Sequence, residues 1–323
     1  MNPDQSIDDE YNVWSGDENN AWSVTPQTVG ELWNVIGQLA FAFGSETKFV
    51  WRGMSRSSYS MTSTLYRALD NSGAETTEAN HQAVEQKMLQ KARKWGLGHT
   101  RYGQATDLQL LAELQHHGFP TRLIDVTVNP MTALWFACSE NPDEPGRLVA
   151  IAGPNMAEVE TSPTLDTSPT AEDMDRPLGA QYRHHLNNSE KTQVPFLVNS
   201  TVRDARMNAQ EGLFIASSVP AEDEGTPFPS LPVPESNRIQ LRLRKALHDR
   251  GIVMAPNTGW GHYDVLGLEI SPEMKQRLLP VLENTFNRSA RTIYPDMDGF
   301  VRTHASQLLK DLQEDNPRSS NHP

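Results

Sequence analysis

The chain has 323 residues, of which 37% are hydrophobic and 21% charged, and its formal net charge at pH 7 is −13. This length predicts one large domain or two modest ones, and the apolar fraction supports a core of ordinary size. The negative charge repels nucleic-acid phosphates, which argues against general nucleic-acid binding but is compatible with a nucleotide ligand.

The predicted elements of the N-terminal half alternate between helices and short strands. Residues 1–25 are rich in Asp, Glu and Asn, which predicts a flexible acidic arm. Apolar periodicity and capping residues then predict a helix that starts after residues 25–28 and a strand over 48–51 stopped by Gly53. Two helices follow, over 78–95 and 106–116. After them the sequence predicts a strand over 121–126, a helix over 130–139 and a strand over 147–152.

Two segments of the C-terminal half, 154–178 and 219–237, are rich in Pro and acidic residues and are interpreted as loop insertions. The sequence around them predicts strands over 196–198, 213–216 and 238–245, a helix with Ser271 as N-cap and Pro272 at its first position, and a helix near 297–313. Together the elements predict a single α+β domain over residues 26–305, followed by a polar tail over 306–323.

Cysteine usage and hydropathy indicate the compartment. Cys138 is the only cysteine, so no intramolecular disulfide can form, which fits a reducing environment. Because Cys138 ends an apolar run, we interpret it as a core residue rather than a nucleophile. Residues 1–5 do not resemble a signal peptide, and no stretch approaches the roughly 18 apolar residues of a membrane span. We therefore expect a cytoplasmic protein without a membrane partner.

One dense basic run interrupts the acidic sequence, and it consists of Arg238, Arg242, Arg244, Lys245 and Arg250. A solvated face or a strand edge is a more common setting for such a run than a phosphate contact. The run therefore does not change the expectation that the protein lacks general nucleic-acid binding.

The segment 49–53 ends a predicted strand with Trp51, Arg52 and Gly53. The planar guanidinium of an arginine can donate two parallel hydrogen bonds to a phosphate or a carboxylate. A following glycine lets a ligand approach the backbone. A structural salt bridge would explain Arg52 equally well, so this segment alone leaves both interpretations open.

The segment 115–127 places donor-rich side chains between a helix end and a strand. Asp125 is unusual in an otherwise apolar strand. It would either face a ligand or pair with Arg52 or Arg122 inside the fold. Gln115 and Thr121 are further candidates for ligand contacts in this segment.

His116 and His117 are adjacent, so on a helix their side chains point about 100° apart and do not form a chelating pair. The spacings HExxH and CxxC are also absent, and we expect no metal site. Each histidine is interpreted either as a structural residue or as a single ligand-facing donor, acid or base.

Gln210 and Glu211 precede Gly212 and an apolar strand. Small-molecule sites often lie at such strand ends, although a solvated turn would look the same in the sequence. The acidic turn over 294–299 is interpreted as the N-cap of the last helix, with Asp296 or Asp298 as the cap.

These segments together resemble the FRG domain, a family found widely in bacteria and phages. The family has a Phe/Trp-Arg-Gly signature and a Gln-His-x-Gly-x-Pro-Thr-Arg-Leu-Leu-Asp core. The matching positions here are 49–53, 115–125, 129–130, 133–137, 206–214 and 268–299. The resemblance spans roughly residues 30–305, with Ile124 and Val126 standing where the family usually has Leu and Trp. It does not by itself imply one reaction.

The order of these parts is also similar, more loosely, to that of ADP-ribosyltransferases. That similarity implies a split sheet flanked by helices, with NAD as the substrate. It implies that Arg52 holds phosphate or ribose, that Thr127 or Asp125 lines the nicotinamide pocket, and that Glu211 or Gln210 supplies the acid. The predicted catalytic set is therefore Arg52, Asp125 and Glu211. The predicted substrate-binding set is Trp51, Gly53, Gln115, His116, His117, Thr121, Arg122, Thr127 and Gln210.

Three functions are compatible with these residues. The first is an NAD-using ADP-ribosyltransferase or NAD glycohydrolase, acting as a toxin or phage-defence effector with a protein partner such as an antitoxin. The second is a non-catalytic module that binds a nucleotide or a protein. The third, a metal-dependent hydrolase or nuclease, is disfavoured by the missing ligand spacings. The first predicts that Glu211 points into the cleft that holds Arg52, and the second that it points to solvent.

Overall fold

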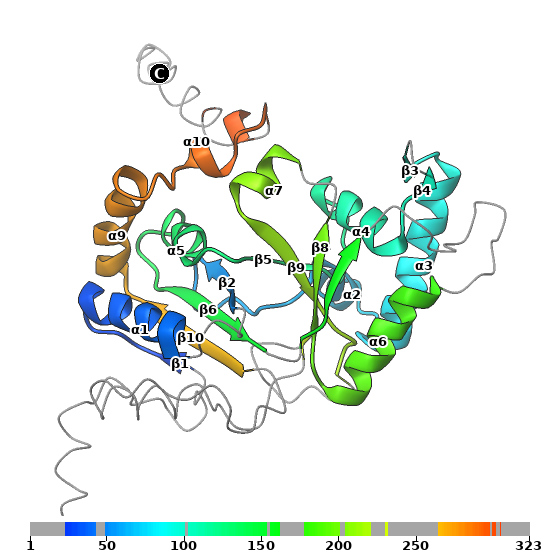
Figure 1. Ribbon diagram of the computed structural model, residues 1–323, viewed down its shortest axis with the longest axis horizontal. Coiled ribbons are helices and arrows are strands. Elements are labelled where there is room, and N and C mark those ends of the chain that lie inside the picture. Colours follow the sequence, from blue (N-terminus) through cyan, green and yellow to red (C-terminus); the bar gives the residue numbers. More distant parts are fainter. Residues whose placement is uncertain are drawn as a thin grey trace, which may run out of the picture.

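The computed structural model describes residues 23–42, 49–100, 103–153, 156–161, 178–200, 204–220, 230–231, 264–297, 299–301 and 304. Most of the acidic arm, the predicted strand over 238–245 with its basic run, and the polar tail lie outside these residues. The described part is an α+β fold, with helices gathered at the two ends of one large sheet (Figure 1).

Eight strands of the described residues form one mixed sheet in the order β1-β10-β6-β2-β5-β9-β8-β7. Its strands are β1 (Ser23–Val24), β2 (Phe49–Met54), β5 (Ile124–Thr127), β6 (Gly146–Ala152), β7 (Glu158–Thr161), β8 (Phe196–Ser200), β9 (Gly212–Ala216) and β10 (Asp264–Ile270). β1 pairs with β10 and β7 pairs with β8 in parallel, while the central strands run antiparallel. A separate hairpin joins β3 (His99–Thr100) to β4 (Gly103–Gln104).

The helices form two groups that pack on different parts of the sheet (Figure 1). The first group, with β2, β6 and β10, builds one apolar core, and it consists of α1 (Val29–Ala42), α5 (Pro130–Cys138) and α9 (Pro272–Asn284). The second packs on β8 and β9 and consists of α3 (Glu78–Lys94), α4 (Asp107–His116) and α6 (Ala180–Thr192). Three short helices complete the described elements: α2 (Thr64–Asn71), α7 (Ala205–Ala209) and α10 (Ala290–Ile293).

Most predicted elements are confirmed, and their caps explain why. Thr106 accepts a hydrogen bond from the backbone amide of Gln109 at the start of α4, and Ser271 accepts one from Met274 at the start of α9. Asn129 caps α5 in the same way, with Pro130 at the first position of the helix. Such caps satisfy amides that have no partner within the helix, and so they fix where it begins.

Two predictions about strands are wrong. β2 does not stop at Gly53 but continues to Met54, paired with β6 throughout. The glycine is needed because α5 crosses the strand there: a Cβ atom at Gly53 would lie 1.7 Å from the carbonyl oxygen of Ala133. The segment 154–178 is not all loop, since β7 lies within it and buries Val159 beside β8.

Cys138 is confirmed as a core residue. It is buried among the side chains of the α1, α5 and α9 core, and burial raises the pKa of its thiol to about 12, against the opposing charge of Lys275. Lys275 is itself buried, and its ammonium donates to the backbone carbonyls of Ser55, Asn141 and Glu140 at 2.6, 2.9 and 3.2 Å. It thereby ties α9 to the ends of β2 and α5.

His81 of α3 predicts a pH dependence of stability. Its side chain is fully buried, with Nδ1 2.9 Å from the carbonyl of Thr77, and Nε2 has no partner among the described residues. Burial lowers the pKa of the imidazole below its usual 6.5. In this range the unfolded chain binds more protons, so we expect stability to fall as the pH drops from about 6.5 through the folded-state pKa.

The variant His81→Phe tests this expectation, because phenylalanine fills a similar volume and does not titrate. Urea unfolding between pH 5 and 7 should show a weaker loss of stability on acidification in the variant than in the wild type. His99→Phe, at an exposed histidine, controls for the removal of one imidazole. Equal pH slopes in the wild type and His81→Phe would contradict the expectation.

Candidate ligand-binding cleft

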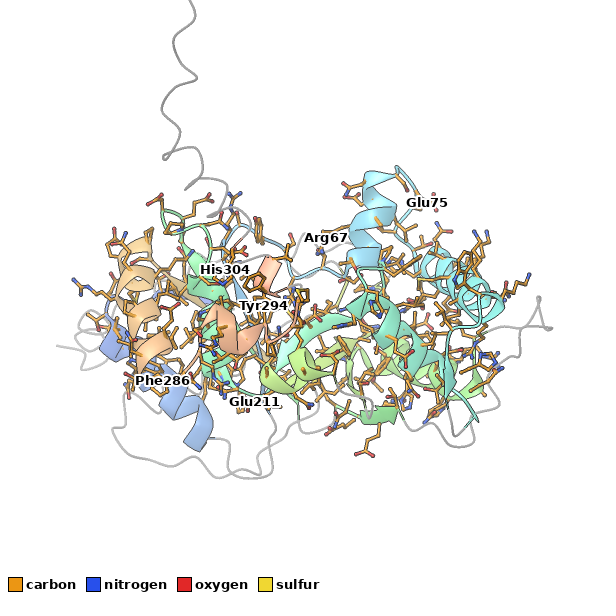
Figure 2. The ribbon with its side chains drawn as sticks, turned by 90° about the horizontal axis from the view of Figure 1, so that it is seen from above. Arg67, Glu75, Glu211, Phe286, Tyr294 and His304 are labelled. Atoms are coloured by element: carbon orange, nitrogen blue, oxygen red, sulfur yellow. The ribbon has the colours of Figure 1, made fainter. Side chains whose placement is uncertain are left out.

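A cleft of about 350 Å³ lies beside the central strands β2, β5 and β9, and α4 and α5, one from each helical group, also contribute to its lining. Tyr294, labelled in Figure 2, is among the residues that line it. The cleft is lined by residues of β2, α4, β5, α5, α7, β9 and the segments next to them: Trp51, Arg52, Gly53, Thr64, Gln115, His116, Gly118, Phe119, Asp125, Val126, Thr127, Phe136, Arg206, Met207, Gln210, Gly212, Leu213, Phe214 and Tyr294.

The strand register explains the floor of the cleft. Trp51 lies opposite Thr127, and on the next strand Phe214 lies opposite Asp125. Residues directly opposite each other, and alternate residues along a strand, share one face of a sheet. Trp51, Asp125, Thr127 and Phe214 therefore face the same side, and polar and aromatic groups meet there.

Arg52 lies where the pairing between β2 and β5 ends. The two strands pair at the single position Trp51–Thr127, and the Arg52 Nη1 then donates to the backbone carbonyl of Asp125. The same nitrogen is 3.9 Å from Asp125 Oδ2, while the buried Nε has no partner. Burial lowers the pKa of the guanidinium, whereas the charge of Asp125 raises it. Arg52 is thus fixed in place, and within the described residues its Nη2 has no hydrogen bond.

Asp125 presents its carboxylate to the opening, since 68% of the side chain is exposed. Gln115 Nε2 donates to its Oδ1 at 3.1 Å, and the Thr121 hydroxyl in turn donates to Gln115 Oε1. Thr121 is buried and does not line the cleft. Thr121 therefore positions Gln115, and Gln115 orients Asp125. Asp125 contacts Arg52 and still faces the cleft, so both of its predicted settings occur together.

An aromatic wall faces this polar pair. The guanidinium of Arg206 lies over the ring of Tyr294, 4.7 Å from its centroid, and Phe136 meets the same ring edge-on at 6.1 Å. Phe119 lines the cleft and is half exposed. Flat apolar surfaces beside a guanidinium suit a planar heterocycle. The sequence analysis missed Arg206 and Tyr294 as site residues, although both lie in segments that it singled out.

Three other predicted residues line the cleft but also serve the structure around it. The Thr127 hydroxyl donates to the Gln210 carbonyl at 2.7 Å, and Gln210 Nε2 donates to the Ile293 carbonyl at 3.3 Å. His116 Nδ1 is 3.1 Å from Asp204 Oδ2. These contacts hold α7 and α10 against the end of β5, so they keep the cleft walls together.

Glu211 is not brought into the cleft. Its backbone has a positive φ of 49°, and its Oε1 accepts from Asn129 Nδ2 at 2.8 Å and from Arg288 Nη2 at 2.7 Å. Of the predicted catalytic set, Arg52 and Asp125 converge and Glu211 does not. The turn after α7, which was the alternative interpretation of this segment, directs the Glu211 carboxylate towards Arg288. Glu211 therefore does not point into the cleft, as the transferase interpretation of the sequence required of it.

Arg122 and His117 also lie outside the cleft, which corrects their predicted place in it. Arg122 is buried, with its guanidinium bonded to Glu85, Glu78 and the carbonyl of Ser217. Tyr182 donates to the same Glu85 carboxylate at 3.1 Å. His117 is exposed at the end of α4 and meets His116 edge-on. Arg122 therefore anchors α3 and α6 beneath the cleft instead of facing a ligand.

Two general properties of the described residues bear on the class of site. Within them, no three His, Cys, Asp or Glu side chains gather in a way that could hold a metal ion. None of their helices combines the length and the apolar character that crossing a bilayer requires.

The acidic turn before the last helical residues is a cap, as expected, because Asp296 Oδ1 accepts a hydrogen bond from the Gly299 amide at 2.7 Å.

Comparison with known families identifies one part of the chain. Residues 47–145 match the FRG domain, so the chain contains an FRG domain. This match is shorter than the 26–305 assigned from the sequence, and it includes Arg52, Gln115 and Asp125. Arg206 and Tyr294 come from outside it. Neither the curated proteins nor the solved structures gave a match, and the similarity to ADP-ribosyltransferases stays a prediction.

Proposed function

We propose that the cleft binds a nucleotide of the NAD type and that the protein cleaves the bond between its nicotinamide and ribose. The observation that carries the proposal is that Arg52 and the exposed Asp125 carboxylate line the same cleft, with Arg52 Nη1 3.9 Å from Asp125 Oδ2. In a chain with a net charge of −13, arginines facing a shared cleft favour an anionic ligand locally. The cleft's size lies within the usual range for small-molecule sites.

Each wall supports a different part of such a ligand. The guanidinium of Arg52 offers donors that match phosphate oxygens. The ring of Tyr294, flanked by Arg206 and Phe136, offers a surface on which a heterocycle stacks. The Asp125 carboxylate, oriented by Gln115 and 3.9 Å from Arg52 Nη1, would act on the ribose.

The proposed reaction needs only one carboxylate. When the bond between ribose C1′ and the nicotinamide nitrogen breaks, its electron pair goes to that nitrogen, and the cationic ring leaves as neutral nicotinamide. Positive charge develops at C1′, and the Asp125 carboxylate stabilises it. Water, or a hydroxyl of an acceptor, then forms a bond to C1′ and gives its proton to Asp125 or solvent. Asp125 takes the role first assigned to Glu211.

Purified protein incubated with NAD tests this proposal, with free nicotinamide followed by chromatography and binding by calorimetry. Asp125→Asn is expected to lower nicotinamide release by about 100-fold or more, as for loss of a preorganised charge, while changing the NAD Kd less than about threefold. Arg52→Ala is expected to weaken NAD binding by about tenfold or more. Glu211→Gln is the control and should keep its activity.

The outcomes separate the alternatives. Nicotinamide release by Asp125→Asn at the wild-type rate would overturn the catalytic role of this residue. Binding of NAD without release by the wild type would identify a non-catalytic nucleotide-binding module. Absence of both would end the nucleotide proposal.

The cellular role follows from the proposed reaction. An enzyme that consumes NAD harms its host when it is unchecked, so we propose a toxin or phage-defence effector that a protein partner restrains. Overproduction of the wild type should then slow growth and lower cellular NAD, while Asp125→Asn should do neither. Equal growth with the two proteins would contradict this role.

A further inference from the structure

A third arginine lies on α2, the helix whose first residue reaches the cleft, and it has no assigned role. Arg67 belongs to α2, whose first residue, Thr64, lines the cleft. Its Nη1 donates to the carbonyl and the hydroxyl of Thr62 at 2.7 and 3.1 Å, and the side chain is exposed. Within the described residues no carboxylate forms an ion pair with it. Figure 2 shows Arg67 on the side of α2 towards Tyr294.

The positive charge of Arg67 affects the pKa of Arg52. The pKa of the Arg52 guanidinium is lowered first by burial, raised by Asp125, and lowered again by the positive charge of Arg67. Two like charges held near each other destabilise the empty site, and a bound anion would remove that cost. The hydrogen bonds to Thr62 hold Arg67 in this position, although a surface arginine could otherwise turn away into solvent.

We infer that Arg52 and Arg67 together form a diphosphate subsite, so that the cleft prefers ligands with two linked phosphates over those with one. The two guanidinium groups come from different elements, β2 and α2, and a single phosphate cannot use both forks as fully as two linked phosphates can. The inference rests on the proposed nucleotide cleft and specifies which part of the ligand lies at its α2 end.

The subsite also orients the ligand along the cleft. Arg206 is stacked on Tyr294, and this wall is then left for a heterocycle. The phosphates would occupy the end near Arg67, and the ring would occupy the end near Phe136. The ribose between them would lie over the carboxylate of Asp125.

Calorimetry on the full chain tests the subsite with inorganic pyrophosphate and orthophosphate as probes, and with ADP and AMP as a second pair. The wild type is expected to bind the diphosphate of each pair about tenfold or more tightly, since a charge-assisted hydrogen bond is worth about that factor. Arg67→Ala should lose this preference while its affinity for orthophosphate changes less than about threefold. Arg67→Gln, which keeps one donor for Thr62, should lose it as well.

Arg183→Ala is the matched control, because Arg183 is exposed on α6 and the change in net charge is the same. It should keep the wild-type preference. The inference is overturned if the wild type binds both members of each pair equally, or if both Arg67 variants keep the preference. A preference for diphosphates without any binding or cleavage of NAD would support the subsite and reject the proposed function. NAD binding that is unchanged in Arg67→Ala would reject the subsite and leave the proposed function standing.

Discussion

Replacing Arg122 with methionine is expected to lower the free energy of unfolding by about 3–5 kcal/mol, because it leaves a buried carboxylate without its partner. Glu85 is fully buried and accepts two hydrogen bonds from Arg122 Nε, at 2.9 and 3.0 Å, and one from Nη2 at 2.7 Å. Glu78 accepts two more from Nη1, at 3.0 and 2.9 Å. Urea unfolding at neutral pH measures the loss.

A second variant separates the loss of the ion pair from the loss of packing. In Arg122→Met combined with Glu85→Leu, the unpaired charge is gone, so we expect part of the lost stability to return. Arg122→Lys keeps the charge but not the forked geometry and should lie between the single variant and the wild type. A loss below about 1 kcal/mol in Arg122→Met would show that the network contributes little.

Replacing Gly53 with alanine is expected to cost about 3 kcal/mol or more, because the new methyl group would overlap the backbone of α5. A Cβ atom there would lie 1.7 Å from the Ala133 carbonyl oxygen and 2.8 Å from the Ala137 amide nitrogen. Backbone atoms within a helix cannot yield as a flexible side chain can. Either α5 must move away from β2, or the strand must bend.

Gly37→Ala is the matched control for this change. A Cβ atom at Gly37 meets nothing within 4 Å, and the residue lies within α1. Alanine there should be neutral or should stabilise the protein by up to about 1 kcal/mol, as expected in a helix interior. Thermal and urea unfolding of both variants give the comparison. Equal stabilities for Gly53→Ala and the wild type would show that α5 is free to move.

At Gly53 the sequence predicted the right place in the fold but not the contact that requires a glycine there. The pattern Trp51-Arg52-Gly53 marked the right place, since all three residues line the cleft. The structure adds a second reason for the glycine to the one offered, access for a ligand to the backbone, because α5 crosses the strand at this position. The contact with α5 joins segments that are about 80 residues apart, and local sequence carries no sign of such a contact.

The same limit explains which site residues the sequence could reveal. Asp125 was recognisable because a carboxylate is out of place in an apolar strand, and Arg52 because the sequence predicted it at the end of one. Arg67 and Tyr294 look ordinary in their own segments, and only the packing of α2 and α10 brings them to the cleft. Arg122 was assigned to the site because a sequence does not distinguish a buried arginine from an exposed one.

Strands were missed for a related reason. β7 contains one buried apolar residue, Val159, among polar neighbours, and β10 precedes a helix start that the sequence did reveal. Both strands gain their stability from a partner strand, and pairing is a property of the whole sheet. Helices with their own caps, such as α4, α5 and α9, were predicted closely because the signals that start them are local.

The strand order has a practical consequence for dividing the chain. The FRG match over 47–145 supplies β2 and β5 but ends just before β6, the strand that pairs with β2 along its whole length. On the other side, β5 is covered by β9 from residues 212–216. A fragment cut at the limits of the match would expose two unpaired strand edges, which invite association with other chains. The limits of the family signature are therefore not those of a unit that can be expressed alone.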